Sequence, residues 1–338
     1  MSHNPKEAEK EMKKAIFISR LLVSRRFDCY VDEHFKTRKW TLDYMKIRRK
    51  IGENGAKEMK IVNSNGKALP IPQIPLPKKV MAFRSIAIFF FDQNLITFLR
   101  RFQRFFNICE TMLYIRAENV RILEFIVLNT LPTLKDTIKS TILNPVIFRQ
   151  MRQFAPSVLI DCPDLSSVSF EGAIFPAFPP DDSANASDAQ AVTKWLFTPR
   201  HDNLWKELSI VNSTMEQWST NLEQIKAAFS DASSPVSFII YIEFPPPFPI
   251  DSIASFKRTN EFTGEQLTLA PFELEANVFR LIRCSSEEGS EEKWQKALKE
   301  LFCIQHQIDI WIGDDEGDDG LLDASSAGPS CDQKEQKK

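Results

Sequence analysis

Short apolar stretches alternate with amphipathic helical patterns from residue 85 to residue 244, and this alternation constrains the fold more than any other feature. Residues 85–91 form a continuous apolar run, which is typical of a strand buried on both faces. Residues 94–105 follow with apolar side chains at helical spacing and arginines between them. We then expect a strand at 111–116 and a helix at 118–129. This rhythm favours a curved stack of strand–helix units over a compact nucleotide-binding fold.

The second half of the chain continues the rhythm and adds clear helix boundaries. Asn144 followed by Pro145 predicts a helix start, because Asn caps a helix and Pro suits its first turn, and this helix is expected to end at Phe154. Ser187 is expected to cap a second helix that runs to Phe197. The remaining expectations are strands at 157–160, within 161–170, at 204–211 and at 236–244, a helix at 221–229, a turn at 131–134 and a loop at 175–186.

After three consecutive prolines at 245–247 the pattern becomes that of a meander. Residues 253–259 and 266–270 are expected to pair as a hairpin around the turn at 260–264, and residues 278–284 to add a third strand. A last short strand is expected at 308–312. The predicted fold is therefore α/β: an irregular, leucine-rich-like stack of strand–helix units, closed by a C-terminal antiparallel meander that shields the open end of the stack.

The chain divides into four predicted segments. Prolines recur through residues 69–77, where they remove amide donors and favour an extended connector. We therefore expect an N-terminal segment of helix and strands at 1–62, a Pro-rich linker at 63–80 and the main α/β domain at 81–313. Residues 314–338 begin with a run of Asp, Glu and Gly, which predicts an acidic, disordered tail.

The formal net charge of −2 hides a strong asymmetry. Residues 1–160 contain 29 Lys and Arg against 14 Asp and Glu, whereas residues 161–338 contain 14 against 31. The halves can attract each other or face different partners. A nucleic-acid-binding protein using the basic first half is the alternative function, with Lys and Arg of 78–104 on phosphates and interleaved Phe rings on bases. The Phe residues fall at core spacing, however, so we expect them to face inward and the arginines to face solvent.

Motifs that carry chemistry are missing from the sequence. Only 10 glycines are present and none forms a phosphate-binding loop, while the four histidines share no metal-binding spacing. The six cysteines are widely spread, so we expect reduced, mostly buried thiols. We therefore predict a non-enzyme without cofactor or metal. Since there is no secretory signal and no apolar run of the roughly 20 residues that span a bilayer, a cytoplasmic or nuclear protein without membrane contact is expected.

A partner-contact surface is predicted from residue type and loop position. The loop at 175–182 presents two Phe among prolines, and Trp and Arg dominate interface energetics. The alternative for the helix at 187–197 is that its Trp packs onto the sheet, because large aromatic side chains carry much of a core. The predicted contact residues are Phe175, Phe178, Trp195, Arg200 and Trp205.

Four stretches taken together resemble a known family. They are Ala-Gln-Ala-Val-Thr-Lys-Trp-Leu-Phe-Thr-Pro-Arg at 189–200, the strand–helix–strand from 208 to 240, the hairpin at 256–267 and the closing strand at 278–282. In order and spacing they resemble the large nematode families of F-box proteins with an F-box-associated domain, over roughly residues 80–313. The resemblance implies a substrate-recognition subunit whose associated domain grips a protein target.

In that family an N-terminal F-box docks on the Skp-type adaptor of a cullin ubiquitin ligase. This chain departs from the pattern: residues 1–26 offer one short helix, and Leu69-Pro70 opens a Pro-rich stretch that cannot be helical. The F-box is either reduced to its last helix at 13–26 or lost. The expected function is a protein–protein interaction module, acting as the substrate receptor of a Skp–cullin–F-box ligase or alone.

Overall fold

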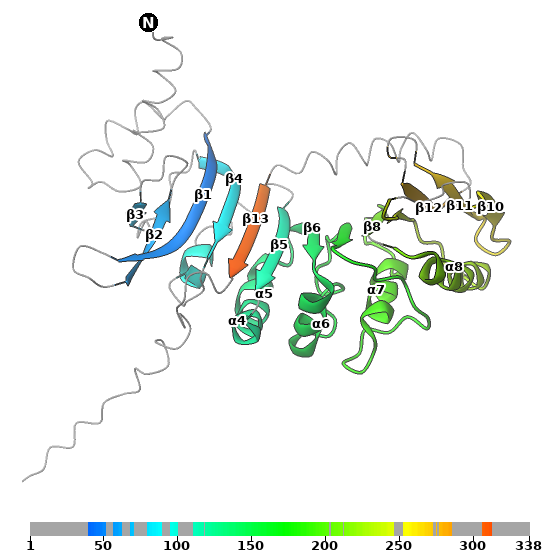
Figure 1. Cartoon of the computed structure of the whole chain (residues 1–338), viewed down its shortest axis with the longest axis horizontal. Coiled ribbons are helices and arrows are strands. Elements are labelled where there is room, and N and C mark those ends of the chain that lie inside the picture. Colours follow the sequence, from blue (N-terminus) through cyan, green and yellow to red (C-terminus); the bar gives the residue numbers. More distant parts are fainter. Residues whose placement is uncertain are drawn as a thin grey trace, which may run out of the picture.

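The computed structural model describes residues 40–51, 57–62, 68–70, 80–89, 95–100, 111–117, 119–202, 204–211, 213–246, 253–272, 275, 277–285 and 306–312. These residues contain a mixed sheet of 13 strands in the order β10-β11-β12-β9-β8-β7-β6-β5-β13-β4-β1-β2-β3 (Figure 1). The strands are β1 (Trp40–Ile51), β2 (Lys57–Val62), β3 (Ala68–Pro70), β4 (Val80–Ile88), β5 (Thr111–Ala117), β6 (Ile138–Leu143), β7 (Ser167–Phe170), β8 (Lys206–Ile210), β9 (Phe238–Glu243), β10 (Phe256–Thr259), β11 (Glu265–Pro271), β12 (Val278–Ser285) and β13 (His306–Ile312).

Helices connect successive strands in the middle of this sheet. Residues 95–100 are helical, and further along the chain come α4 (Val120–Phe125), a π-helical turn (Ile126–Thr130), α5 (Leu131–Leu134), α6 (Pro145–Phe154), α7 (Asp188–Phe197) and α8 (Met215–Ser230). From β5 to β9 each new parallel strand is added beside the preceding one, and the labelled helices lie along one side of the strands (Figure 1). The strands β9, β12, β11 and β10 then pair antiparallel. The predicted α/β fold with a C-terminal antiparallel meander is confirmed.

Alternating burial along the strands explains why the helices cover only one face. In β8 the side chains of Leu208 and Ile210 are buried, whereas Glu207 and Ser209 are partly exposed. The same alternation in β7 buries Phe170, whose ring lies 5.3 Å from that of Phe148 in α6. Apolar side chains at every second position therefore bind the sheet to its helices, and the opposite face of these strands is more polar.

The predicted helix starts are confirmed. Asn144 caps α6 by accepting a hydrogen bond from the backbone nitrogen of Val146 through its Oδ1 atom (2.9 Å). Ser187 caps α7 in a complete capping box with Gln190. The hairpin of β10 and β11 is also confirmed, and Gly264 in its turn has a φ of 71°, the left-handed conformation that favours glycine.

Two other predicted elements are wrong, one strand was not predicted, and one predicted helix begins earlier than expected. Residues 131–134 form α5 instead of a turn, because Pro132 lies in the first turn of the helix, where its missing N–H is tolerated. Residues 157–160 form turns instead of a strand, since the backbone nitrogen of Asp161 donates to the carbonyl of Ser157 (2.9 Å). The strand β6 was not predicted, because Ser140 and Thr141 interrupt its apolar pattern. The helix α8 begins six residues before the predicted start at 221.

The last described strand, β13, lies in the middle of the sheet. It pairs in parallel with β4 on one side and with β5 on the other. The strand itself was predicted at 308–312, but its place between two strands from the first half of the chain was not. The strands β1 and β4, from either side of the predicted linker, are also hydrogen-bonded neighbours, and β3 lies within the linker range. The predicted domain boundaries remain a prediction, as do the helix and strand expected before residue 40 and the tail after residue 313, which lie outside the described residues.

Candidate functional site

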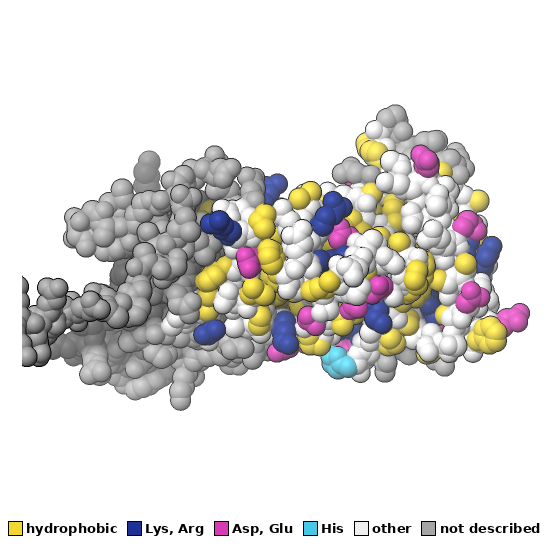
Figure 2. All heavy atoms as spheres, turned by 90° about the horizontal axis from the view of Figure 1, so that it is seen from below, with side chains coloured by type: hydrophobic (Ala, Val, Ile, Leu, Met, Phe, Trp, Pro, Cys, Tyr) yellow, Lys and Arg dark blue, Asp and Glu magenta, His cyan; other side chains and the backbone are white. Residues whose placement is uncertain are grey.

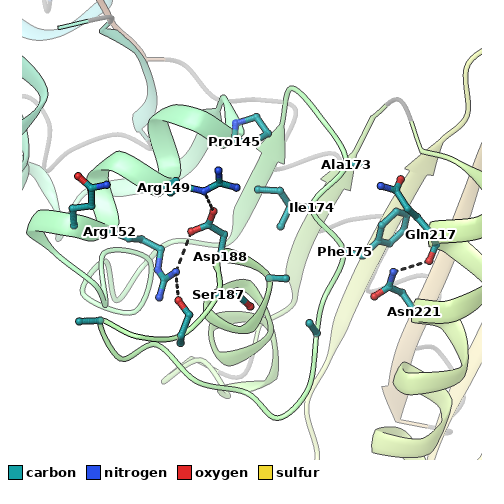
Figure 3. A pocket seen from close by; sticks show the side chains of 15 residues that line it. Pro145, Arg149, Arg152, Ala173, Ile174, Phe175, Ser187, Asp188, Gln217 and Asn221 are labelled. Atoms are coloured by element: carbon teal, nitrogen blue, oxygen red, sulfur yellow. Dashed lines mark hydrogen bonds and ion pairs between the residues drawn. The ribbon is translucent and has the colours of Figure 1, made fainter. Parts of the chain in front are cut away.

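A cavity of about 590 Å³ opens between α6, α7 and α8 (Figure 3). The predicted loop at 175–186, of which residues 175–182 were predicted as a contact segment, contributes part of the cavity wall. The cavity therefore combines a helical frame with a surface loop. Its lining comes from α6, from the segment after β7, from the start of α7 and from α8: Pro145, Arg149, Arg152, Gln153, Ala173, Ile174, Phe175, Ala177, Ala184, Ala186, Ser187, Asp188, Ala189, Gln217 and Asn221.

Arg152 anchors the loop to α6 from below the surface. Its side chain is only 6% exposed. The guanidinium donates to the carbonyl oxygens of Pro156 (3.3 Å), Ser183 (3.0 Å) and Ala186 (2.9 Å), and to Oδ1 of Asp188 (3.0 Å). Every nitrogen of this guanidinium therefore has a partner, and a buried cation is neutralised as burial requires.

Asp188 connects the two arginines of α6. It is the first residue of α7, where the positive end of the helix dipole favours a carboxylate. Its Oδ2 atom accepts a hydrogen bond from Nε of Arg149 (2.9 Å). The side chain of Arg149 is 71% exposed, and its guanidinium lies between Pro145 and Ile174 (Figure 3). The bond to Asp188 leaves both Nη nitrogens of Arg149 without a partner among the described residues.

The floor of the cavity is apolar. Ile174 and Phe175 are buried, and the ring of Phe175 lies 6.2 Å from that of Trp218 in α8. Several alanines that line the cavity leave space that larger side chains would fill: Ala173, Ala177, Ala186 and Ala189, together with Ala184 at the rim. On the opposite wall Asn221 donates through Nδ2 to the carbonyl of Gln217 (2.6 Å), so the amides of α8 form a polar rim (Figure 3).

Hydrogen bonds hold the loop in one conformation. Gln190 of the capping box donates through Nε2 to the carbonyl of Pro179 (3.1 Å). Asp181 accepts hydrogen bonds from the backbone nitrogen and the hydroxyl of Ser183, and these lower the pKa of its carboxyl below the ordinary value. The cavity wall is therefore preorganised although it belongs to a loop.

The predicted contact residues are mostly internal. Trp195 is 1% exposed in the core beneath α7, and Phe175 is buried on the cavity floor. Arg200 is also buried, and its ion pair with Asp202 (2.5 Å) holds the pKa of that carboxyl well below its usual range. The structure thus assigns these three side chains to packing, because the large aromatic residues and the buried arginine fill the space between helices and sheet.

The two other predicted contacts are partly buried. The ring of Phe178 packs edge-on against Phe197 at 5.3 Å. Trp205 directly precedes β8. Arg149, Arg152 and Asp188 were not predicted as site residues. In the sequence they look like ordinary charged residues, and only the packing of α6 beside α7 brings them together. The spacing of the two arginines by three residues on a helix places them on one face, and no other local signal marks them.

A buried lysine lies at the other end of α7. Lys206 donates through Nζ to the carbonyl oxygens of Trp195 and of Thr198, which end the helix. Burial lowers the pKa of this amine to about 7. The neighbouring Glu207 lies on the opposite face of β8, where its partial burial removes water from the carboxyl and raises its pKa to about 7. Both groups therefore respond to pH near neutrality.

The structure also bears on the predictions about thiols, metal sites and basic surfaces. Of the two described cysteines, Cys162 is a buried free thiol, as expected, and Cys284 is partly buried. Within the described residues no group of three or more His, Cys, Asp or Glu side chains forms a metal-binding cluster. In the helix at 95–100, Phe98 is buried and Arg100 exposed, as expected for a core-facing Phe. Figure 2 shows the helical side of the described chain, where Lys and Arg are interspersed with Asp and Glu.

The described helices include none that is long and apolar enough to cross a membrane. Comparisons with protein-family models, with curated proteins and with solved structures found no match to this chain.

Proposed function

We propose that the chain is a protein-interaction module that receives a segment of a partner protein in the cavity between α6, α7 and α8. The observation that supports this most strongly is the preformed cavity itself, with an apolar floor and a few fixed polar groups. Its volume of about 590 Å³ lies within the range of about 300–1,000 Å³ that is usual for binding pockets. Binding sites are commonly carried by loops on a rigid scaffold, as here.

An open rim favours a protein segment over a small enclosed ligand. Ala184, Ser187 and Gln217 are exposed where they line the cavity. Pockets for small molecules usually bury most of their ligand, whereas a groove with an exposed rim suits a chain that enters and leaves it. The mixture of charges on the helical side also supports a protein partner over nucleic acid, which requires a continuous basic surface (Figure 2).

The family resemblance extends this proposal to ubiquitin ligases. In such a protein the segment bound in the cavity belongs to a target, and an F-box remnant near residues 13–26 docks on a Skp-type adaptor. Co-purification of the full chain with a Skp-type adaptor tests this part. Failure to bind the adaptor would leave a stand-alone interaction protein without affecting the cavity proposal.

Photocrosslinking from the rim tests the cavity directly. A photoreactive amino acid at Ala184 is expected to crosslink a partner protein, and the same amino acid at the adjacent Asn185, which does not line the cavity, is expected to crosslink it weakly. Ala184→Trp is expected to abolish capture, while Asn185→Trp preserves it. Equal capture by both variants, or no crosslinked protein from a folded chain, would contradict the proposal.

A further inference from the structure

We infer that the segment received by this cavity carries an aspartate or glutamate whose carboxylate binds the free Nη pair of Arg149, next to an apolar side chain that enters the cavity. This inference rests on the proposed function and specifies the chemistry of the partner. It follows from which polar groups of the cavity are already occupied and which are not.

Three charged residues line the cavity: Arg149, Arg152 and Asp188. Each nitrogen of the Arg152 guanidinium is already bonded, to one of three carbonyl oxygens or to Asp188. Asp188 uses both carboxylate oxygens, one for each arginine. The charged residues of the lining therefore carry one positive charge in excess, and the two Nη atoms of Arg149 are the only guanidinium nitrogens among them that have no partner within the described residues. An anionic group complements this arrangement.

Arg149 is held in place although it is mostly exposed. A free arginine side chain loses considerable rotamer freedom when it binds a ligand. Here Asp188 fixes the Nε edge of Arg149 at 2.9 Å, and Arg152 fixes Asp188 at 3.0 Å. Arg152 is in turn bonded to three backbone carbonyls. The orientation of the Arg149 guanidinium is therefore fixed by a chain of contacts that begins at the buried Arg152. This preorganisation lowers the cost of binding at its open edge.

A carboxylate matches this edge better than a phosphate does. Two N–H groups on the planar guanidinium can meet the two oxygens of a carboxylate in parallel. Phosphopeptide sites generally use clusters of arginines, whereas Arg149 is the one arginine of this lining with free ends. The carboxylate of Asp188, immediately beside it, would also repel a dianionic phosphate more than a single negative charge.

The apolar floor next to Arg149 determines the second feature of the partner segment, which is its apolar side chain. Figure 3 shows the Arg149 guanidinium pointing toward the side of the cavity where Ile174 lies, and Ala173 and Phe175 also line the cavity as apolar residues. An acidic residue bound at Arg149 therefore places its neighbour in the chain over this floor. We expect that neighbour to be aliphatic or aromatic, because burial of apolar surface contributes most of the affinity of such contacts.

Binding of blocked peptides to the full chain tests the inference. The probes are acetylated and amidated heptapeptides with a central Leu-Asp pair and varied flanks, together with the same peptides containing Leu-Asn and Leu-phosphoserine. Fluorescence anisotropy is expected to show binding of some Leu-Asp peptides and binding of their Leu-Asn versions about 10- to 100-fold weaker, as expected for loss of a hydrogen bond to a charged group.

Variants of the chain test whether the preference for Leu-Asp peptides depends on Arg149. Arg149→Gln is expected to weaken the Leu-Asp peptides by the same factor and to leave the Leu-Asn peptides unchanged, while Arg149→Lys restores part of the loss. The variant should fold, because an exposed ion pair contributes little to stability. Arg121→Gln, at an exposed arginine of α4 outside the lining, is the matched control and should bind as the wild type does.

Three results would overturn the inference. If no Asp peptide binds, or if the phosphoserine peptides bind most tightly, the partner does not present a carboxylate. If Leu-Asp and Leu-Asn peptides bind equally and Ala184→Trp abolishes both, the cavity binds protein segments without a carboxylate contact. In that case the inference fails and the proposed function stands. The crosslinks from position 184 decide the proposed function separately.

Discussion

Arg152 and Asp188, which are 36 residues apart in the chain, form an ion pair of 3.0 Å that joins α6 to the first residue of α7. Both side chains are largely shielded from solvent, at 6% and 13% exposure. The pair fixes the loop between β7 and α7 and orients Arg149 at the rim, so the stability of the fold and the shape of the cavity depend on the same contact.

Asp188→Asn is expected to destabilise the chain by about 3–5 kcal/mol, because it leaves the buried cation of Arg152 without its counter-charge. Urea unfolding measures the free energy of unfolding. The control is Glu261→Gln, at an exposed carboxylate in the turn of the hairpin of β10 and β11. A loss below about 1 kcal/mol for Asp188→Asn would show that the carbonyl partners of Arg152 suffice.

Ser187→Ala is expected to cost about 0.5–2 kcal/mol, because the N-cap hydroxyl then no longer accepts from the backbone nitrogen of Gln190 (3.2 Å). The matched control is Ser219→Ala within α8, where no cap is lost. Helix α7 is also expected to exchange its first amide hydrogens faster in the variant. Equal exchange in both proteins would argue against a role for the cap.

Lys206 makes stability depend on pH above neutrality. Its folded pKa of about 7 lies below the ordinary 10.5, so the unfolded chain binds more protons between these values and stability rises with pH across that window. Each unit of pKa difference corresponds to about 1.4 kcal/mol. Lys206→Met is expected to reduce this rise when urea unfolding is compared at pH 7, 8 and 9. A slope identical to that of the wild type would exclude Lys206 as its source.

Glu207 has the opposite effect at lower pH. Burial raises its folded pKa to about 7 from 4.5, so the folded chain binds more protons between these values and stability falls as the pH rises from 4.5 to 7. Glu207→Gln cannot titrate and should remove this fall. Urea unfolding at pH 5, 6 and 7 measures it, with Glu243→Gln at an exposed position of β9 as the control. An unchanged slope in Glu207→Gln would contradict the prediction.

The parts of the fold that could be predicted are those with local causes. Asn144 and Ser187 satisfy backbone N–H groups within three residues, so the starts of α6 and α7 are visible in the sequence. The strand β6 depends on distant partners: Thr141 donates through its hydroxyl to the carbonyl of Leu113, 28 residues earlier. A buried polar side chain is tolerated in a strand when a neighbouring strand accepts its hydrogen bond. The local sequence does not show which strand that neighbour is.

The candidate site could be predicted only in outline. The loop at 175–186 was expected from its composition, and it does line a cavity. The choice of Trp195 and Arg200 as contacts followed residue type, which does not distinguish an interface from a core, and both side chains are buried. Arg149 was not singled out, because its importance arises from the packing of α6 against α7, and that packing is tertiary.

The position of β13 has a consequence for how the protein is made. Its strand enters between β4 and β5, so until residues 306–312 have left the ribosome these two strands present unpaired edges to one another and to other chains. The sheet is therefore completed only after residues 306–312 have emerged. A chain that ends at residue 305 is expected to sediment as aggregates, whereas the full chain remains in the supernatant; a soluble, monomeric truncated chain would show that the gap closes without β13.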